Sequence, residues 1–245
     1  MKIAAWNLNH RIHKKPIPET VAAIIRTLSP DVLVLTEYVD ADDREAFKHA
    51  LRDIGPYHVS VSEKRPKHNQ VLVASRLDHI DGGLPSPTES HAETNFLPIT
   101  IPALDLVIVG MRAPAYTATA AVKAYWEELI VILEAVSTRK IILVGDVNGD
   151  PDSPRSTGGR YMAALRKKGW QVSSPAEPWS YISGDGLRKS RVDHLLASPA
   201  VNVVSAAYKD EVDDIVAAGP KNRKPISDHA ILCCEVSISP PVRAR

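Results

Sequence analysis

Short apolar runs alternate with polar segments along the whole chain. Runs typical of strands cover residues 2–8, 31–37, 57–62, 70–75, 96–102, 104–112, 140–146, 191–198 and 229–236. Residues 96–102 and 104–112 follow each other too closely for a helix to lie between them. Other runs are separated by helical patterns. This mixture predicts an α/β (α+β) protein whose sheets contain antiparallel pairs and carry helices outside.

Helical periodicity marks four of the segments between these runs. In the first segment Val21, Ile25 and Leu28 recur at the spacing of one helix face, and Pro18 suits its first turn. Residues 42–54, 117–137 and 155–169 are also typical of helices. The longest of these predicts a buried stripe, formed by Tyr125, Leu129, Ile132, Leu133 and Val136.

Length and composition favour one large domain. The chain has 245 residues, of which 44% are hydrophobic, so we expect a single catalytic domain over residues 1–238 and a tail at 239–245. No apolar run is long enough to span a membrane, and the start turns polar at once. We therefore expect a cytoplasmic protein. Cys233 and Cys234 are adjacent, which favours two buried thiols in a reducing compartment over a strained disulfide.

Polar side chains stand at the ends of several predicted strands, where a core does not need them. They are Asn7, Asn9, Glu37, Asp146, Asn148, Asp150, Asp193, Asp228 and His229. Each alone is most often a turn former or a helix cap. If these strand ends share one edge, the carboxylates repel each other unless a cation lies among them. Oxygen ligands favour Mg²⁺ or Mn²⁺, whereas the cysteines lack the spacing of zinc ligands.

An Asp-His pair precedes the last apolar run. Imidazole can exchange a proton near neutral pH, and a carboxylate can fix its orientation. Adjacent side chains on a regular strand point to opposite faces, so Asp228 is a poor partner for His229. We expect Asp193 to be that partner.

The order of these motifs resembles a known family. "AAWNLN", "DVLVLTE", "ILVGDVNGD", "RVDHLLAS" and "ISDHAIL" resemble the endonuclease/exonuclease/phosphatase superfamily, and within it the exonuclease III-like and apurinic endonuclease branch. The resemblance extends from Met1 to about Val236. It implies a four-layered α/β sandwich of two mixed sheets packed face to face, with helices outside. It also implies hydrolysis of a phosphate ester by in-line attack of water, assisted by Mg²⁺ or Mn²⁺.

The resemblance also implies a role for each motif residue. The implied metal ligands are Glu37, Asn9 and Asp228. The resemblance implies that Asp146 positions or deprotonates the attacking water. It implies that Asn7 and Asn148 hold the phosphate and orient Asp146. It also implies that His229 contacts the phosphate, with Asp193 as its carboxylate partner. Which of Asp146 and His229 is the base stays open.

Two positions depart from the family pattern. Arg112 stands where the family usually has Tyr or His, and its guanidinium could clamp the phosphate. The alternatives are a surface arginine after a strand, and Tyr116 as the replacement for the phenol. Asn69 lies in a strand entry that lacks the family's small residues. It is either a substrate contact or an ordinary polar residue at the entry of a strand.

Residues 178–194 resemble the aromatic-rich segment of apurinic endonucleases. Trp179, Ser180 and Tyr181 match its first part, but no aromatic residue occurs between Ile182 and Arg191. An extruded abasic sugar needs an apolar, aromatic pocket, so specific cleavage at abasic sites is in doubt. The substrate-binding candidates are Asn69, Arg11, Trp179, Tyr181 and Arg191.

Charge is balanced over the whole chain but clustered locally. The net charge is +1, which does not by itself indicate a nucleic-acid binder. Basic residues cluster beside the motifs, in residues 11–15, 64–67, 188–191 and 221–224. Such a basic rim around an acidic centre suits DNA or RNA, although loops are commonly charged.

These observations favour a divalent-metal-dependent phosphodiesterase, with a nuclease acting on DNA or RNA as the first hypothesis. A phosphatase or phosphodiesterase for a small molecule or lipid headgroup is the alternative, because the chain has few insertions that could grip a duplex. A binding module that has lost catalysis is disfavoured, because the motif residues are all present. The oligomeric state is not predicted.

Overall fold

A computed structural model describes residues 1–9, 16–115, 119–153 and 155–238. Three of the predicted features lie outside these residues: Arg11, Tyr116 and the tail at 239–245.

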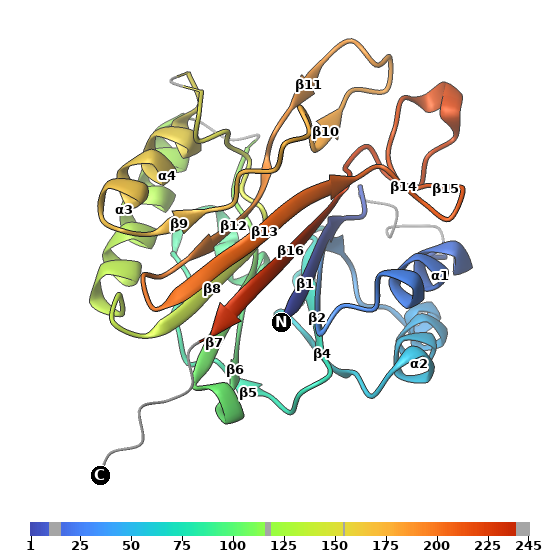
Figure 1. Cartoon of the computed structure of the whole chain (residues 1–245), viewed down its shortest axis with the longest axis horizontal. Helices are drawn as coiled ribbons and strands as arrows, with labels where there is room; N and C mark the ends of the chain where they lie inside the picture. Colours follow the sequence, from blue (N-terminus) through green and yellow to red (C-terminus); the bar gives the residue numbers. More distant parts are fainter. Residues whose placement is uncertain (10–15, 116–118, 154, 239–245) are drawn as a thin grey trace.

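Two six-stranded mixed sheets form the framework of the described chain (Figure 1). The first sheet has the order β13 (Val201–Lys209), β16 (Ile231–Ile238), β1 (Lys2–Asn7), β2 (Val32–Tyr38), β4 (Gln70–Ser75) and β3 (His58–Val61). The second has the order β5 (Ile80–Asp81), β6 (Phe96–Ile101), β7 (Leu106–Arg112), β8 (Lys140–Asp146), β12 (Asp193–Ala197) and β9 (Gln171–Val172). β1 pairs with β2, and β7 with β8, in parallel, and the other neighbours are antiparallel.

Four helices cover the outer faces of the two sheets. They are α1 (Glu19–Leu28), α2 (Glu45–Ile54), α3 (Thr119–Ala135) and α4 (Thr157–Lys167). Apolar residues of α1 and α2 share a buried cluster with the first sheet, and those of α3 and α4 share one with the second sheet. A third cluster fills the space between the sheets. The predicted four-layered sandwich is therefore confirmed.

Strand β2 shows how the sequence builds these layers. Val32 and Val34 belong to the core between the sheets, whereas Leu33 and Leu35 pack toward the helices. Side chains alternate between the faces of a strand, so a continuous apolar run is buried on both sides. Burial stabilises the fold by about 1.5–3 kcal/mol for each such side chain.

Short elements complete the chain. Two small hairpins join β10 (Tyr181–Ile182) to β11 (Lys189–Ser190) and β14 (Glu211–Val212) to β15 (Ile215–Val216). Turns of 3₁₀ helix are η1 (Asp42–Arg44), η2 (Glu89–Thr94), η3 (Pro102–Leu104) and η4 (Lys221–Arg223). No helix in the described ranges is long and apolar enough to cross a membrane.

The sequence missed one long strand, β13. Its residues Val201–Lys209 include Ala and Ser, and several of its side chains are exposed. A bulge between Val203 and Ser205 also interrupts its pairing with β16. Because β13 is the edge strand of its sheet, it needs no continuous apolar run. The boundaries of the predicted helix at 42–54 also changed, because its first turn is the separate 3₁₀ turn η1.

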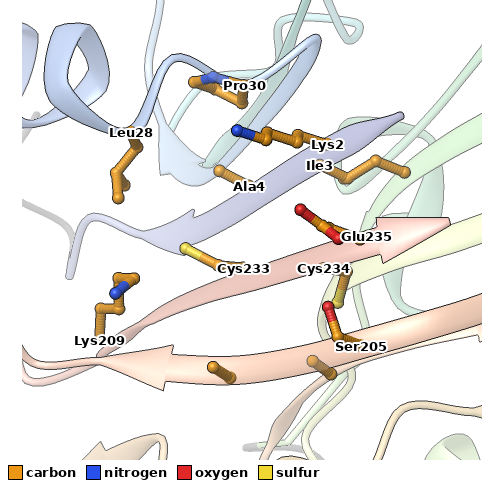
Figure 2. Close-up of a pocket in the computed structure, with 12 residues that line it drawn as sticks. Lys2, Ile3, Ala4, Leu28, Pro30, Ser205, Lys209, Cys233, Cys234 and Glu235 are labelled. Carbon is orange, nitrogen blue, oxygen red and sulfur yellow. The ribbon is translucent and has the colours of Figure 1, made fainter.

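The two cysteines face opposite sides of β16, as Figure 2 shows. Cys234 lies in the core between the sheets, whereas Cys233 packs on the helix side and is half-buried. Both are free thiols. Burial raises the pKa of Cys233 to about 11, which keeps that thiol protonated at neutral pH. Cys233 also lines a cavity of about 250 Å³ over β1, β13 and β16.

Candidate active site

The predicted strand ends meet at one edge of the sandwich. Asp146 is opposite Arg112 in the β7–β8 register and opposite Asp193 in the β8–β12 register. Asn7 ends β1 in the other sheet, and its Nδ2 donates to Asp146 Oδ2 at 2.9 Å. This hydrogen bond joins the two sheets at their shared edge.

Gly145 allows β8 to approach β7 closely just before Asp146. Its φ is +141°, and a Cβ at this position would lie 2.2 Å from the carbonyl oxygen of Met111. A residue with a side chain would therefore force β8 away from β7. The glycine of the GDxN motif thus helps to set the separation of Arg112 and Asp146.

Asp146 is buried and held on both carboxylate oxygens. The backbone N–H of Asn148 donates to Oδ1 at 3.1 Å, while Asn7 holds Oδ2. Burial raises the pKa of Asp146, although the positive charges of His229 and Arg112 oppose that shift. A carboxylate with a raised pKa is a stronger base than an exposed one.

His229 and Asp193 form a buried pair. His229 Nδ1 lies 2.9 Å from Asp193 Oδ2, the partner expected from the sequence. Asp228 was excluded as this partner on the assumption that Asp228 and His229 lie on a regular strand. That assumption was wrong, because residues 227–229 precede β16. Burial alone would lower the pKa of His229, but the charge and hydrogen bond of Asp193 outweigh it and raise this pKa to about 9. The imidazole is therefore a cation at neutral pH.

Hydrogen bonds from residues to which the sequence assigned no role hold His229 and its neighbours. Ser227 Oγ donates to the carbonyl of Asn7 at 2.7 Å and accepts the backbone N–H of His229 at 3.1 Å. Trp6 Nε1 donates to the carbonyl of His229 at 2.8 Å. Ser180 Oγ accepts the backbone N–H of Asp193 at 3.1 Å. Ser180 and Ser227 lie in segments of the sequence that resemble the family. Serines are common in turns, so their presence there did not indicate that they hold site residues.

Arg112 lies between two carboxylates. Its Nε is 3.0 Å from Glu37 Oε1 and 3.6 Å from Asp146 Oδ2. The side chains of Arg112 and Glu37 are only 13% and 6% exposed. The interpretation of Arg112 as a surface arginine is therefore wrong.

Asp228 has a buried carboxylate oxygen that lacks a hydrogen bond within the described part of the chain. Its Oδ1 is 3.9 Å from His229 Nε2, and this buried oxygen accepts no hydrogen bond from any described residue. Burial raises the pKa of Asp228, and the charges of Glu37 and Asp146 raise it further. Because the charges of Glu37 and Asp146 affect this pKa, Asp228 is part of the same cluster of carboxylates as these two residues.

The backbone is in the left-handed region at three of the predicted site residues. The φ angles are +55° at Asn9, +53° at Glu37 and +48° at Asn148. Asn tolerates this region, but Glu costs about 1–2 kcal/mol there. The pairing of β2 with β4 shifts register across Glu37. Such strain persists only where the surroundings impose it, so the sheet edge imposes the conformation that positions the Glu37 carboxylate.

The amides have different partners. Asn9 donates its backbone N–H to Asn7 Oδ1 at 2.8 Å. Asn148 Nδ2 donates to the carbonyl of Ala113 at 2.7 Å, so this amide fixes the segment after β7. Asn69 is buried and directly precedes β4, whose first residue pairs with Tyr38. It therefore lies at the same end of the sheet as Glu37.

The aromatic substrate-binding candidates lie on the β10–β11 side of the site. Tyr181 forms a backbone bridge with His229, and their ring centroids are 5.2 Å apart. Trp179 packs against the core, and Lys189 Nζ lies 5.7 Å from the centre of its ring. Tyr181 is therefore the aromatic side chain nearer to the histidine.

Arg191 is held by the loop that follows β8. Its Nη2 lies 3.2 Å from Asp150 Oδ1 and 2.8 Å from Asp152 Oδ2. Asp152 is also bound by Arg166 at 2.7 Å. These ion pairs fix the loop that carries Asp150, and they occupy the guanidinium that the sequence assigned to substrate.

The donor set suits a hard divalent cation. Ligand atoms of Asp146, Asp193 and His229 lie within 4.8 Å of one another. This set differs from the expected ligands Glu37, Asn9 and Asp228. Asp193 and His229 are already bound to each other, whereas Asp228 has a free buried oxygen. A site rich in carboxylate oxygen favours Mg²⁺ or Mn²⁺ over softer metals, so the residues present fit such an ion.

The fold and this edge define a known class. The sequence matches the model of the Endonuclease/Exonuclease/phosphatase family over residues 4–229. The chain therefore belongs to this family, whose members are phosphoester hydrolases. No protein with a curated description matches the sequence.

Solved structures show the same fold at low sequence identity. An AP endonuclease from Archaeoglobus fulgidus is 20% identical, with a TM-score of 0.71, and the match covers 97% of this chain and 100% of that one. A 3'-5' exonuclease (NExo) from Neisseria meningitidis is 22% identical, with a TM-score of 0.69 and coverage of 96% and 99%. The 3' phosphatase NExo from Neisseria, bound to a product DNA hairpin, is 21% identical, with a TM-score of 0.69 and coverage of 97% and 99%.

Proposed function

We propose that this protein is a divalent-metal-dependent phosphodiesterase that hydrolyses nucleic acid. The observation that carries the proposal is the buried edge that brings together two hydrogen-bonded pairs, Asn7 with Asp146 and Asp193 with His229, with Arg112 beside Asp146. A family of phosphoester hydrolases and a neighbour bound to a DNA hairpin agree with it.

Charge balance supports a divalent cation. The edge holds four carboxylates and two cations, namely Glu37, Asp146, Asp193, Asp228, Arg112 and His229. Within this set the carboxylates outnumber the cations by two. Burial makes such an excess costly. Mg²⁺ or Mn²⁺ held by Glu37 and Asp228, with Asn9 beside them, would match it and would stabilise negative charge on the phosphate.

Asp146 is the base in this proposal. Its carboxylate is oriented by Asn7 and by the backbone of Asn148, so one oxygen can be directed at a water molecule that attacks the phosphorus. Burial raises its pKa, which favours proton abstraction. The pKa of about 9 for His229 argues against the imidazole as base, since it is already protonated at neutral pH.

His229 and Arg112 serve the phosphate. Asp193 holds Nδ1 of the imidazolium, so Nε2–H is left to donate to a phosphoryl oxygen. The guanidinium of Arg112 can donate to a second oxygen, as expected from the sequence. Donors fixed in advance in a buried site stabilise the charge that develops in the transition state.

A basic wall beside the site supports a polyanionic substrate. It consists of Arg188 and Lys189 on the β10–β11 hairpin and Lys221 and Lys224 around η4, all exposed. The two segments touch, because the backbone N–H of Lys221 donates to the carbonyl of Gly184 at 2.9 Å. Figure 1 shows both rising beyond the end of the sheets where β1 ends and β16 begins.

The charges of the basic wall are available to a ligand. Among the described residues, Arg188, Lys221 and Lys224 make no ion pair. Arg223 is excluded from the wall because it binds Asp210 and Glu211. The backbone N–H of Ile182 donates to the carbonyl of Asp228, so the hairpin is fixed directly to the catalytic edge. A strand whose phosphate sits at His229 would pass beside these cations.

A substrate panel tests this proposal. Purified protein is incubated with plasmid, single-stranded DNA, DNA with an abasic site and RNA, each with Mg²⁺, Mn²⁺ or EDTA. We expect metal-dependent cleavage of at least one polymer. A parallel set contains phosphomonoesters and lipid headgroup diesters. Turnover of these compounds alone would contradict the nuclease proposal and favour a small-molecule phosphoesterase.

A further inference from the structure

Arg112 occupies an unusual place for a strand-end arginine. It is the last residue of β7, and the β7–β8 register sets it opposite Asp146. Its guanidinium lies within ion-pair distance of both Glu37 and Asp146, on the two sheets of the sandwich. Within the described part of the chain it is therefore an arginine that compensates carboxylates at the proposed catalytic edge.

Charge rather than directional bonding holds this guanidinium. Arg112 Nε is buried, yet it makes no hydrogen bond of acceptable geometry within the described chain. Arg191 differs, because its Nη2 forms hydrogen bonds with both Asp150 and Asp152. A side chain held only by attraction to carboxylates can move when a stronger competitor for those carboxylates arrives.

The proposed metal ion is such a competitor. A divalent cation on Glu37 would claim the oxygen that now faces Arg112, and two cations so close to each other repel strongly at low dielectric. We propose that Arg112 is a resident counter-ion of the metal site, which neutralises Glu37 and Asp146 in the metal-free protein. When the metal site fills, its guanidinium turns from these carboxylates toward the substrate phosphate.

This inference deepens the proposed metal-dependent function and assigns Arg112 two positions. In the first position the arginine keeps the carboxylates together without metal. In the second it is released for the phosphate only when the metal site is filled, so substrate binding and metal binding support each other. An arginine that served only the phosphate would not oppose metal binding.

Metal binding without substrate tests the inference. The probe is Mn²⁺, and the free ion is measured by electron paramagnetic resonance during titration of the protein. We expect Arg112→Gln to bind Mn²⁺ about tenfold more tightly than wild type, because one repelling charge is gone. Arg112→Lys, which retains the charge, should stay within about threefold of wild type. Arg166→Gln removes a partly exposed arginine that binds Asp152, and it is the matched control with unchanged affinity.

Thermal unfolding gives a second readout. In EDTA, Arg112→Gln should unfold at a lower temperature than wild type, because its carboxylates lose their counter-ion. Added Mn²⁺ should stabilise this variant more than it stabilises wild type. Unchanged or weaker Mn²⁺ affinity in folded Arg112→Gln would overturn the inference. If Arg112→Gln does not fold without metal, tenfold altered affinity in Arg112→Lys would overturn it instead.

The outcome is separable from that of the proposed function. Tighter Mn²⁺ binding by Arg112→Gln together with no cleavage of any nucleic acid would keep the counter-ion and reject the nuclease. Cleavage of nucleic acid by wild type, with no effect of Arg112→Gln on Mn²⁺ affinity, would keep the nuclease proposal and reject the counter-ion role of Arg112.

Discussion

Two acid–arginine clusters draw on overlapping parts of the sequence but differ in burial, in charge balance and in the pKa values of their carboxylates. The edge cluster contains four carboxylates and two cations, namely Glu37, Asp146, Asp193, Asp228, Arg112 and His229. The loop cluster contains two carboxylates and two arginines, namely Asp150, Asp152, Arg166 and Arg191. The side chain of Asp146 is 2% exposed, whereas that of Asp152 is 45% exposed. Burial raises the pKa of Asp146, whereas the hydrogen bond from Arg166 lowers the pKa of Asp152.

The difference distinguishes a candidate catalytic site from an ion-pair network that holds a loop in place. In the loop cluster each carboxylate is matched by an arginine, and all four side chains are partly exposed to solvent, where such pairs contribute little. In the edge cluster the carboxylates outnumber the cations in a buried place, which is costly unless a ligand completes the balance. Residue type alone therefore does not indicate function, whereas residue type combined with burial and charge imbalance does.

Asp146→Asn should give the largest effect. Loss of the proposed base is expected to lower kcat on the best substrate of the panel by about 10²–10⁴-fold. The melting temperature should not fall, because a buried negative charge is removed. Steady-state kinetics and thermal unfolding measure the two effects. Asp152→Asn in the loop cluster is the control, and it should keep kcat within about twofold. Equal losses in both variants would remove the distinction between the clusters.

Asp193→Asn should change both the rate and its pH dependence. In the proposed function His229 acts as a cation, so activity should fall as the pH rises through about 9, the pKa of His229. Without the charge of Asp193 that raises it, this pKa falls toward its ordinary value, and the loss of activity should begin at lower pH. Profiles of kcat/KM against pH for both proteins measure the displacement. If activity falls at the same alkaline pH in wild type and in Asp193→Asn, this fall does not reflect the titration of His229.

Removal of charge from the basic wall should have an intermediate effect. The double change Arg188→Gln and Lys221→Gln is expected to raise KM for a polymeric substrate about tenfold, with little change in kcat. The slope of log affinity against log salt concentration should fall by about two, because two phosphate contacts are lost. Binding measured at several salt concentrations tests this expectation. The control is a small phosphodiester, whose hydrolysis should not change.

Arg166→Gln should give the smallest effect. It breaks an exposed ion pair with Asp152, and such pairs contribute about 0–1 kcal/mol. We expect a shift of the unfolding free energy within that range and unchanged kinetics. Denaturant titration measures the shift. A loss of several kcal/mol would mean that the loop cluster is as important for stability as a buried network.

The sequence predicted the layers well because buried strands have a strong signal. Residues 32–35 of β2 are apolar on both faces, and the helix at Glu19–Leu28 has clear periodicity. The edge strand β13 was missed because exposed positions and a bulge erase that signal. Only tertiary pairing with β16 makes those residues a strand.

The site was predicted in composition more than in geometry. The residue types at the strand ends, and the resemblance, brought together Asp146, Asp193 and His229. The backbone conformation of Glu37 and the supporting hydroxyls of Ser180 and Ser227 depend on register and on long-range contacts. A single sequence carries no signal for these contacts, because one serine in a turn looks like any other.

The most direct test is the rate of phosphodiester cleavage as metal is removed and restored. The best substrate of the panel is incubated with wild-type protein in EDTA, and then with increasing Mg²⁺ or Mn²⁺. We predict no cleavage in EDTA and a return of the full rate as the metal saturates. Cleavage that continues at an undiminished rate in EDTA would contradict the proposed role of the edge cluster as a metal-dependent phosphodiesterase centre.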